Sequence, residues 1–135
     1  MDTTALVYMV LFGLAVGSFL NLAIDRVPVG RSMLHPPSHC DSCHIRIPPY
    51  DLVPVISYIL LRGRCRACRW PIPYRAPIVE VATGVIFGVI THVHGLTPLT
   101  GVILGYAALF IVVFVIDLEH LIIPNVLIYP GMLLA

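Results

Sequence analysis

The sequence predicts an all-α membrane protein of about four spanning helices, with a small cysteine-rich domain between the first two. Three observations predict this class. The composition is 59% hydrophobic and 11% charged, whereas charged residues make up about a quarter of a soluble domain. Several apolar runs reach the length that a spanning helix requires. All four cysteines and all eight basic residues lie in one segment after the first apolar run.

The first apolar run, residues 5–24, has about the 20 residues that cross a bilayer. No basic residue precedes it, so we expect a spanning helix rather than a cleaved signal peptide. Gly13, Gly17 and Ser18 form a small-residue patch that permits close approach of another helix. Asn21 needs a polar partner inside the bundle, and we interpret it as a packing residue rather than a catalyst.

The basic residues set the predicted orientation. All eight are arginines that fall between positions 26 and 75, although the net charge is only +1. Short loops rich in arginine stay in the cytoplasm. We therefore expect residues 25–75 to be cytoplasmic and the amino terminus to lie outside.

Two CxxC pairs predict a metal site in this loop. Their cysteines are Cys40, Cys43, Cys65 and Cys68. The spacing is typical of a four-thiolate zinc site, and the alternative is four unrelated buried thiols. Because cytoplasmic thiols stay reduced, a metal is favoured over disulfides. A domain of about 50 residues buries little core, so we expect Zn²⁺ to be structural.

Two features of the loop point to the membrane surface. Arginines surround the second cysteine pair, at Arg62, Arg64, Arg66 and Arg69. We expect them to offset the negative charge of the thiolates. The alternative is a patch that faces lipid headgroups, and the two roles are compatible. Residues 50–61 are apolar but too short to span and interrupted by Pro54. We interpret them as an interfacial or re-entrant segment.

The second and third apolar runs cover about residues 76–93 and 98–116. The polar break between them contains His92 and His94, which we interpret as loop polarity rather than a metal site. Counting crossings, the third helix returns to the cytoplasmic side. A fourth apolar stretch, residues 125–135, is too short to span, so we expect the last helix to be incomplete in this chain, as in a fragment.

Asp117 is the strongest candidate for chemistry. It is one of four acids expected at the cytoplasmic helix ends, namely Asp25, Glu80, Asp117 and Glu119. Taken singly, such acids are interfacial groups that pair with Arg26 or Arg75. Asp117, however, directly follows a long apolar run, and Pro124 soon interrupts the helix. A backbone break at membrane depth must be buried or line a watered cavity, where an aspartate can activate water.

Peptide hydrolysis by carboxyl groups needs two of them, close enough to share a proton. Asp25 or Glu80 could be the partner of Asp117 if the helices pack at the same depth, and a second copy of the chain could also supply a partner. The arginines near Asp25 and Glu80 argue against this, because they would hold those acids ionised.

A series of ordered segments carries a resemblance to a known family. They are residues 17–21, 26–28, 40–43, Asp51 with 54–58, 61–68, 77–80 and 117–124. Through these segments the whole chain resembles the amino-terminal half of the prepilin peptidases, the type IV leader peptidases of bacterial inner membranes. Members are polytopic aspartic proteases that cut the basic leader from type IV prepilins and pseudopilins. Many also methylate the new amino terminus with S-adenosylmethionine.

The resemblance implies roles for individual residues. Asp117 matches the first catalytic aspartate, the four cysteines match the zinc ligands, and residues 76–135 match the start of the peptidase domain. The expected partners are a prepilin or pseudopilin and the lipid bilayer, with no nucleic acid. The second catalytic aspartate of the family lies in a GxGD motif, and no such motif occurs in residues 1–135.

Two other functions compete with this one. The first is a non-catalytic zinc-binding scaffold or pseudoenzyme, for which Asp117 would be dispensable. The second is a methyltransferase that uses S-adenosylmethionine. The residues themselves do not argue for it, because no glycine-rich cofactor loop follows a strand.

Overall fold

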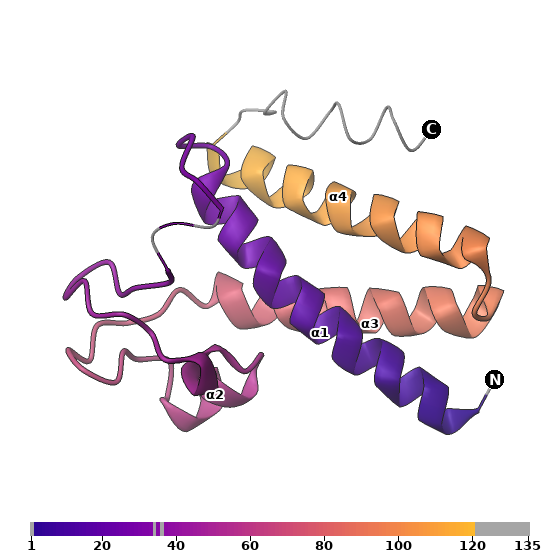
Figure 1. Cartoon of the computed structure of the whole chain (residues 1–135), viewed down its shortest axis with the longest axis horizontal. Coiled ribbons are helices and arrows are strands. Elements are labelled where there is room, and N and C mark those ends of the chain that lie inside the picture. The colour runs from indigo at the N-terminus through magenta and orange to yellow at the C-terminus, as the bar shows by residue number, and fades with distance from the viewer. Residues whose placement is uncertain (1, 34, 36, 121–135) are drawn as a thin grey trace.

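In the computed structural model, three long helices pack side by side and an irregular unit projects from one end of them (Figure 1). The structure describes residues 2–33, 35 and 37–120. The long helices are α1 (Thr3–Arg26), α3 (Arg75–His94) and α4 (Pro98–His120). Each is long and apolar enough to cross a membrane. The predicted all-α, multi-pass class is confirmed.

The helices extend beyond the apolar runs that predicted them. α1 and α3 continue for one or two residues past each run, and α4 continues through Asp117 to His120. An apolar run shows only which part of a helix is suited to hydrocarbon. The helix itself is longer, because its backbone hydrogen bonds continue until a residue interrupts them. The predicted break at Pro124 and the predicted fourth stretch, residues 125–135, lie outside the described residues.

α1 and α3 cross at close range because glycines face the contact. A Cβ atom added at Gly17 would lie 2.7 Å from the Cα of Glu80, and one at Gly13 would lie 2.8 Å from the Cα of Gly84. Farther along the same contact, a Cβ atom added at Gly88 of α3 would lie equally close to the Val10 side chain of α1. The absence of side chains lets the two backbones approach, as small-residue patches do in membrane helices. The packing role predicted for Gly13 and Gly17 is confirmed.

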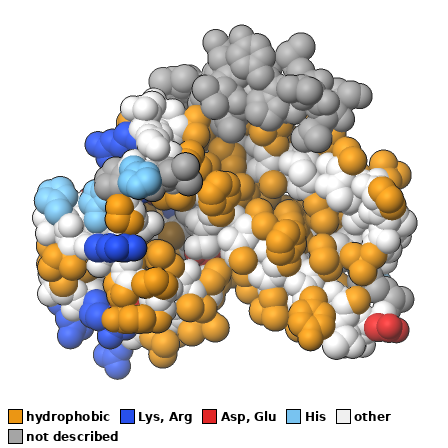
Figure 2. Space-filling view, in the orientation of Figure 1, with side chains coloured by type: hydrophobic (Ala, Val, Ile, Leu, Met, Phe, Trp, Pro, Cys, Tyr) orange, Lys and Arg blue, Asp and Glu red, His pale blue; other side chains and the backbone are white. Residues whose placement is uncertain are grey.

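The apolar core lies at the end of the bundle near the irregular unit. Its buried members come from α1, α3 and α4, and they are Leu20, Ala23, Ile24, Val79, Val112 and Ile116. Many large apolar side chains on the outer helix faces are exposed instead, and Figure 2 shows them covering the visible side of the helices. Such a surface suits helices whose surroundings are hydrocarbon rather than water.

A polar bond also joins α1 to α3. The Asn21 side chain is buried, and its Nδ2 donates to the backbone oxygen of Ala76 at 2.9 Å. The predicted role of Asn21 as a polar link between helices is confirmed. Two buried threonines of α3, Thr83 and Thr91, satisfy their hydroxyls locally by donating to carbonyl oxygens one turn earlier.

The irregular part, called here the cysteine-rich unit, comprises residues 27–74. It contains a short 3₁₀-helix, η1 (Pro49–Leu52), and a short α-helix, α2 (Ile56–Leu60). Among the described residues no β-strand forms, and the unit has only two isolated β-bridges, His39 with Arg46 and Arg64 with Pro71. With so little regular structure, the unit depends on side-chain contacts for its shape.

Candidate functional site

Each CxxC pair lies in a tight backbone loop, and the two loops have the same hydrogen bonds. In the first, Cys40 N donates to Ile45 O and His44 N donates to Cys40 O. In the second, Cys65 N donates to Trp70 O and Arg69 N donates to Cys65 O. His44 and Arg69, which directly follow the two pairs, both have left-handed φ, at 57° and 62°. The two knuckles are therefore structural repeats of each other.

The two knuckles bring all four thiols together. The sulfur atoms lie within 4.8 Å of one another, and Cys40 Sγ is 3.6 Å from Cys68 Sγ. A zinc–sulfur bond is about 2.3 Å, so the sulfurs of a regular tetrahedral site lie roughly 3.8 Å apart. The cluster therefore has the size and donor set to hold a metal ion. Within the described residues it is the only such group, and His92 and His94 are exposed at the end of α3.

The thiols differ in acidity before any metal binds. Hydrogen bonds from the backbone N–H groups of Cys68 and Ala67 lower the pKa of Cys65 to about 7. The Ile45 N–H also lowers the pKa of Cys43, but burial and the other three thiols outweigh it and raise that pKa to about 11. Metal binding must displace the remaining protons, so the affinity of the cluster should rise with pH.

An ion pair ties η1 to the second knuckle. Arg66 donates through Nε and Nη2 to the two carboxylate oxygens of Asp51, at 2.8 and 2.6 Å. The guanidinium also lies over the Tyr50 ring, 5.5 Å from its centroid. The Arg66 side chain holds the pKa of Asp51 below its usual value. Two segments that share no regular structure are thus held together by charge.

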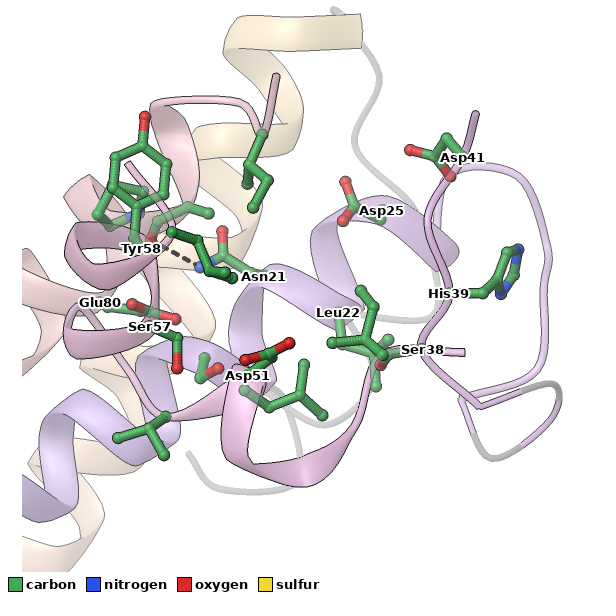
Figure 3. A pocket seen from close by; sticks show the side chains of 18 of the residues that line it. Asn21, Leu22, Asp25, Ser38, His39, Asp41, Asp51, Ser57, Tyr58 and Glu80 are labelled. Carbon is green, nitrogen blue, oxygen red and sulfur yellow. Dashed lines mark hydrogen bonds between the residues drawn. The ribbon is translucent and has the colours of Figure 1, made fainter. Parts of the chain in front are cut away.

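The cysteine-rich unit is attached to the bundle through Glu80. This buried α3 residue accepts a hydrogen bond from the Val55 N–H, at the start of α2, with a length of 2.7 Å. A cavity of about 480 Å³ lies between the unit and the bundle. Figure 3 shows that Asn21, Asp25, Asp51 and Glu80 reach it from different parts of the chain.

Arg75 joins all three long helices at the same end. It is the first residue of α3, and it forms ion pairs with Asp25 of α1 at 2.5 Å and Glu119 of α4 at 2.7 Å. Its own side chain is only 18% exposed. Two of the four acids at the helix ends, Asp25 and Glu119, therefore pair with one arginine. This agrees with their interpretation as interfacial groups that pair with a basic residue.

Asp117 lies near the end of α4 with its side chain exposed. Because Glu119 pairs with Arg75, Asp117 is at the same end of the bundle as the cysteine-rich unit. Asp25 pairs with Arg75 and Glu80 bonds to Val55, so neither is held against Asp117. Within the described part of the chain, no ion pair involves Asp117. The catalytic role of Asp117 stays a prediction.

Sequence reasoning missed two contacts that shape the site. The bonds of Asp51 with Arg66 and of Glu80 with Val55 join residues distant in the chain, and no spacing rule predicts them. The equivalence of the two knuckles was detectable in the sequence. Each begins with CxxC, and the carbonyl that accepts from the first cysteine belongs to Ile45 in one and Trp70 in the other. In both, an isoleucine follows two residues later.

Comparison with protein families gives one clear match. The model of the bacterial peptidase A24 N-terminal domain matches residues 11–94. The matched range includes most of α1, the whole cysteine-rich unit and α3. No solved structure matches the chain.

Curated relatives are similar over nearly the whole chain. The chain is 39% identical to the prepilin leader peptidase/N-methyltransferase of Myxococcus xanthus over 94% of its length and 38% of the relative's. It is 33% identical to the protein of the same name from Neisseria gonorrhoeae, over 87% of this chain and 50% of the relative. A Klebsiella pneumoniae protein of that name is 34% identical, over 93% of this chain and 58% of the relative. The chain therefore spans between 38% and 58% of the length of these relatives.

Proposed function

This chain belongs to the family of the bacterial peptidase A24 N-terminal domain, and on that premise we propose that it forms the amino-terminal part of an aspartic endopeptidase of the bacterial inner membrane. The proposed substrates are type IV prepilins or pseudopilins, whose leader peptide is removed. The observation that carries the proposal is the 30–39% identity to prepilin leader peptidases/N-methyltransferases across most of the chain.

The proposed topology places the chemistry at the cytoplasmic face. All eight arginines lie between positions 26 and 75, so the cysteine-rich unit is proposed to be cytoplasmic and the amino terminus outside. We propose a division into a first span (5–24), a zinc-binding loop (25–75) and the start of the peptidase domain (76–135). The ion pairs of Arg75 support one common level for Asp117 and the loop.

Asp117 is proposed as one carboxyl of a catalytic pair. As a carboxylate it would take a proton from water while the water oxygen attacks the scissile carbonyl carbon. The other carboxyl, kept protonated, would donate a hydrogen bond to the carbonyl oxygen. We propose that this second group lies outside residues 1–135, as the coverage of the relatives supports.

The cofactors follow from the same proposal. Cys40, Cys43, Cys65 and Cys68 would hold a structural Zn²⁺, whose charge offsets the thiolates and fixes the two knuckles together. The N-methyltransferase part of the relatives' name supports S-adenosylmethionine as a methyl donor. We assign no residue of this chain to it.

Substitution of Asp117 tests the proteolytic assignment. In the full-length protein, Asp117→Asn should lower leader cleavage at least about 1000-fold, because an amide cannot accept the proton of water. Cleavage is measured by the shift of a prepilin on a gel after incubation with membranes.

Glu119→Gln is the matched control, because it makes the same chemical change two residues away and removes only the ion pair with Arg75. The rate at which this variant cleaves the leader should stay within about tenfold of the rate of the unmodified protein. Unchanged processing by Asp117→Asn would refute the assignment and favour the scaffold function.

A further inference from the structure

A hollow between the end of α2 and the second knuckle has no role in the proposed proteolysis. Its volume is about 280 Å³, and it is lined by Leu60, Leu61, Arg62, Arg64, Cys65, Arg66 and Arg69. We propose that this hollow binds the phosphate headgroup of an anionic phospholipid and so holds the cysteine-rich unit against the bilayer surface.

The charge of the hollow suits an anion. Four of its seven lining residues are arginines and none is acidic. Arg66 is engaged by Asp51, whereas Arg62, Arg64 and Arg69 are exposed and form no ion pair with a described residue. Four thiolates around a divalent metal leave two negative charges, so the arginines exceed what the knuckle needs. Guanidinium groups bind phosphate through paired N–H donors.

The neighbouring surface suits lipid rather than water. The short helix α2 exposes three large apolar side chains, with 58% of Ile56, 66% of Ile59 and 76% of Leu60 accessible, and Leu60 also lines the hollow. Figure 2 shows arginine and hydrophobic side chains interleaved over the same part of the molecule. Apolar groups next to a basic cluster are typical of segments that lie in the membrane interface.

The start of α2 is held at membrane depth. Its Val55 N–H bonds the carboxylate of Glu80, and Glu80 is five residues beyond Arg75, where α3 begins. At 1.5 Å per residue this is about 7.5 Å along the spanning helix. Figure 1 shows α2 below the beginning of α3. α2 therefore cannot extend freely into the aqueous phase.

The turn that carries two of the arginines is held by contacts with α2. Gly63, between Arg62 and Arg64, has φ +65°, and its N–H donates to Tyr58 O at 2.8 Å. A Cβ added there would lie 2.9 Å from the Tyr58 ring. These contacts restrain the backbone between the two arginines, and such a restraint lowers the entropic cost of binding a ligand.

The apolar neighbours select a lipid over a soluble anion. Free phosphate would contact only the arginines, whereas a phospholipid would also cover Ile59 and Leu60. The proposal depends on the membrane placement of the helices and not on the proteolytic activity. The two can therefore fail separately.

Native mass spectrometry of the full-length protein in neutral detergent tests the site, with short-chain phosphatidylglycerol, short-chain phosphatidylcholine and inorganic phosphate as probes. We expect phosphatidylglycerol to be retained about tenfold or more over phosphatidylcholine. The triple variant Arg62→Gln, Arg64→Gln, Arg69→Gln should lose this preference. Arg46→Gln, an exposed arginine of the first knuckle that does not line the hollow, should keep it.

The same spectra report the bound metal, and so whether the knuckles are folded. If the triple variant loses metal, the pair Ile59→Ser and Leu60→Ser replaces it and should lower phosphatidylglycerol retention several-fold with the metal in place. Equal retention of both lipids would overturn the proposal. So would full preference in the arginine variant or in the serine variant. Displacement of phosphatidylglycerol by equimolar phosphate would show a soluble-anion site instead.

Discussion

The helical bundle and the cysteine-rich unit are stabilised by different kinds of interaction. In the bundle, Gly13 and Gly17 let α1 and α3 approach until backbone contacts backbone, and the outer faces remain apolar. Among the residues of the unit that the structure describes, Cys40 is the only buried hydrophobic one, and Cys, Asp and Arg side chains supply contacts.

The difference reflects the surroundings of each region. Within hydrocarbon, a helix satisfies its own backbone and association rests on close packing. Outside it, a unit of this size buries too small a core to fold alone, so ion pairs and the proposed metal ligation would stabilise it. Three sets of substitutions test whether the two regions are stabilised in these different ways.

Removal of the metal ligands should have the largest effect. The double variant Cys65→Ser, Cys68→Ser should release the bound metal and unfold the unit, because structural zinc in small domains contributes roughly 10–16 kcal/mol of apparent binding free energy. Metal per chain is measured by plasma mass spectrometry and unfolding by limited proteolysis within residues 27–74. Helical circular dichroism should remain.

Ser42→Ala is the matched control, since Ser42 lies between two of the proposed ligands, Cys40 and Cys43, and is not one itself. It should keep the metal and resist the protease. Loss of helicity in the double cysteine variant would mean that the two regions are not independent, and the comparison would fail.

An intermediate effect is expected in the bundle. Gly17→Leu should lower the free energy of unfolding by about 1–3 kcal/mol or more, because the new side chain meets the α3 backbone. Gly101→Ala in α4 is the control, because a Cβ there has nothing within 4 Å, and it should be neutral or slightly stabilising. Thermal unfolding in detergent measures both. Metal content should not change in either variant.

The smallest effect concerns the pair of Asp51 and Arg66. Because Arg66 lowers the pKa of Asp51, the pair stabilises the unit fully above the ordinary carboxyl pKa of about 3.9. This contribution is lost as the pH falls through the lower, folded value. In Arg66→Gln, the carboxyl titration of Asp51, followed by NMR, should move up towards about 3.9. A titration midpoint that does not move would show that Arg66 is not the cause.

The membrane class and the cysteine cluster could be predicted from the sequence because each rests on a strong local signal. An apolar run such as residues 5–24 favours hydrocarbon whatever its neighbours are. Two CxxC pairs leave few other uses for four thiols in so short a loop. The family resemblance, carried by several ordered segments along the chain, is confirmed by the domain match over residues 11–94.

Contacts between distant residues were decided by the tertiary structure. Four acids at the helix ends looked alike in the sequence, yet Asp25 and Glu119 pair with Arg75, Glu80 holds α2, and Asp117 has no ion-pair partner among the described residues. Which acid meets which cation depends on how α1 crosses α3, and that crossing depends on glycine contacts made across the bundle. Hydrophobicity and spacing act locally and can be read along the chain, whereas these pairings exist only once the helices have packed.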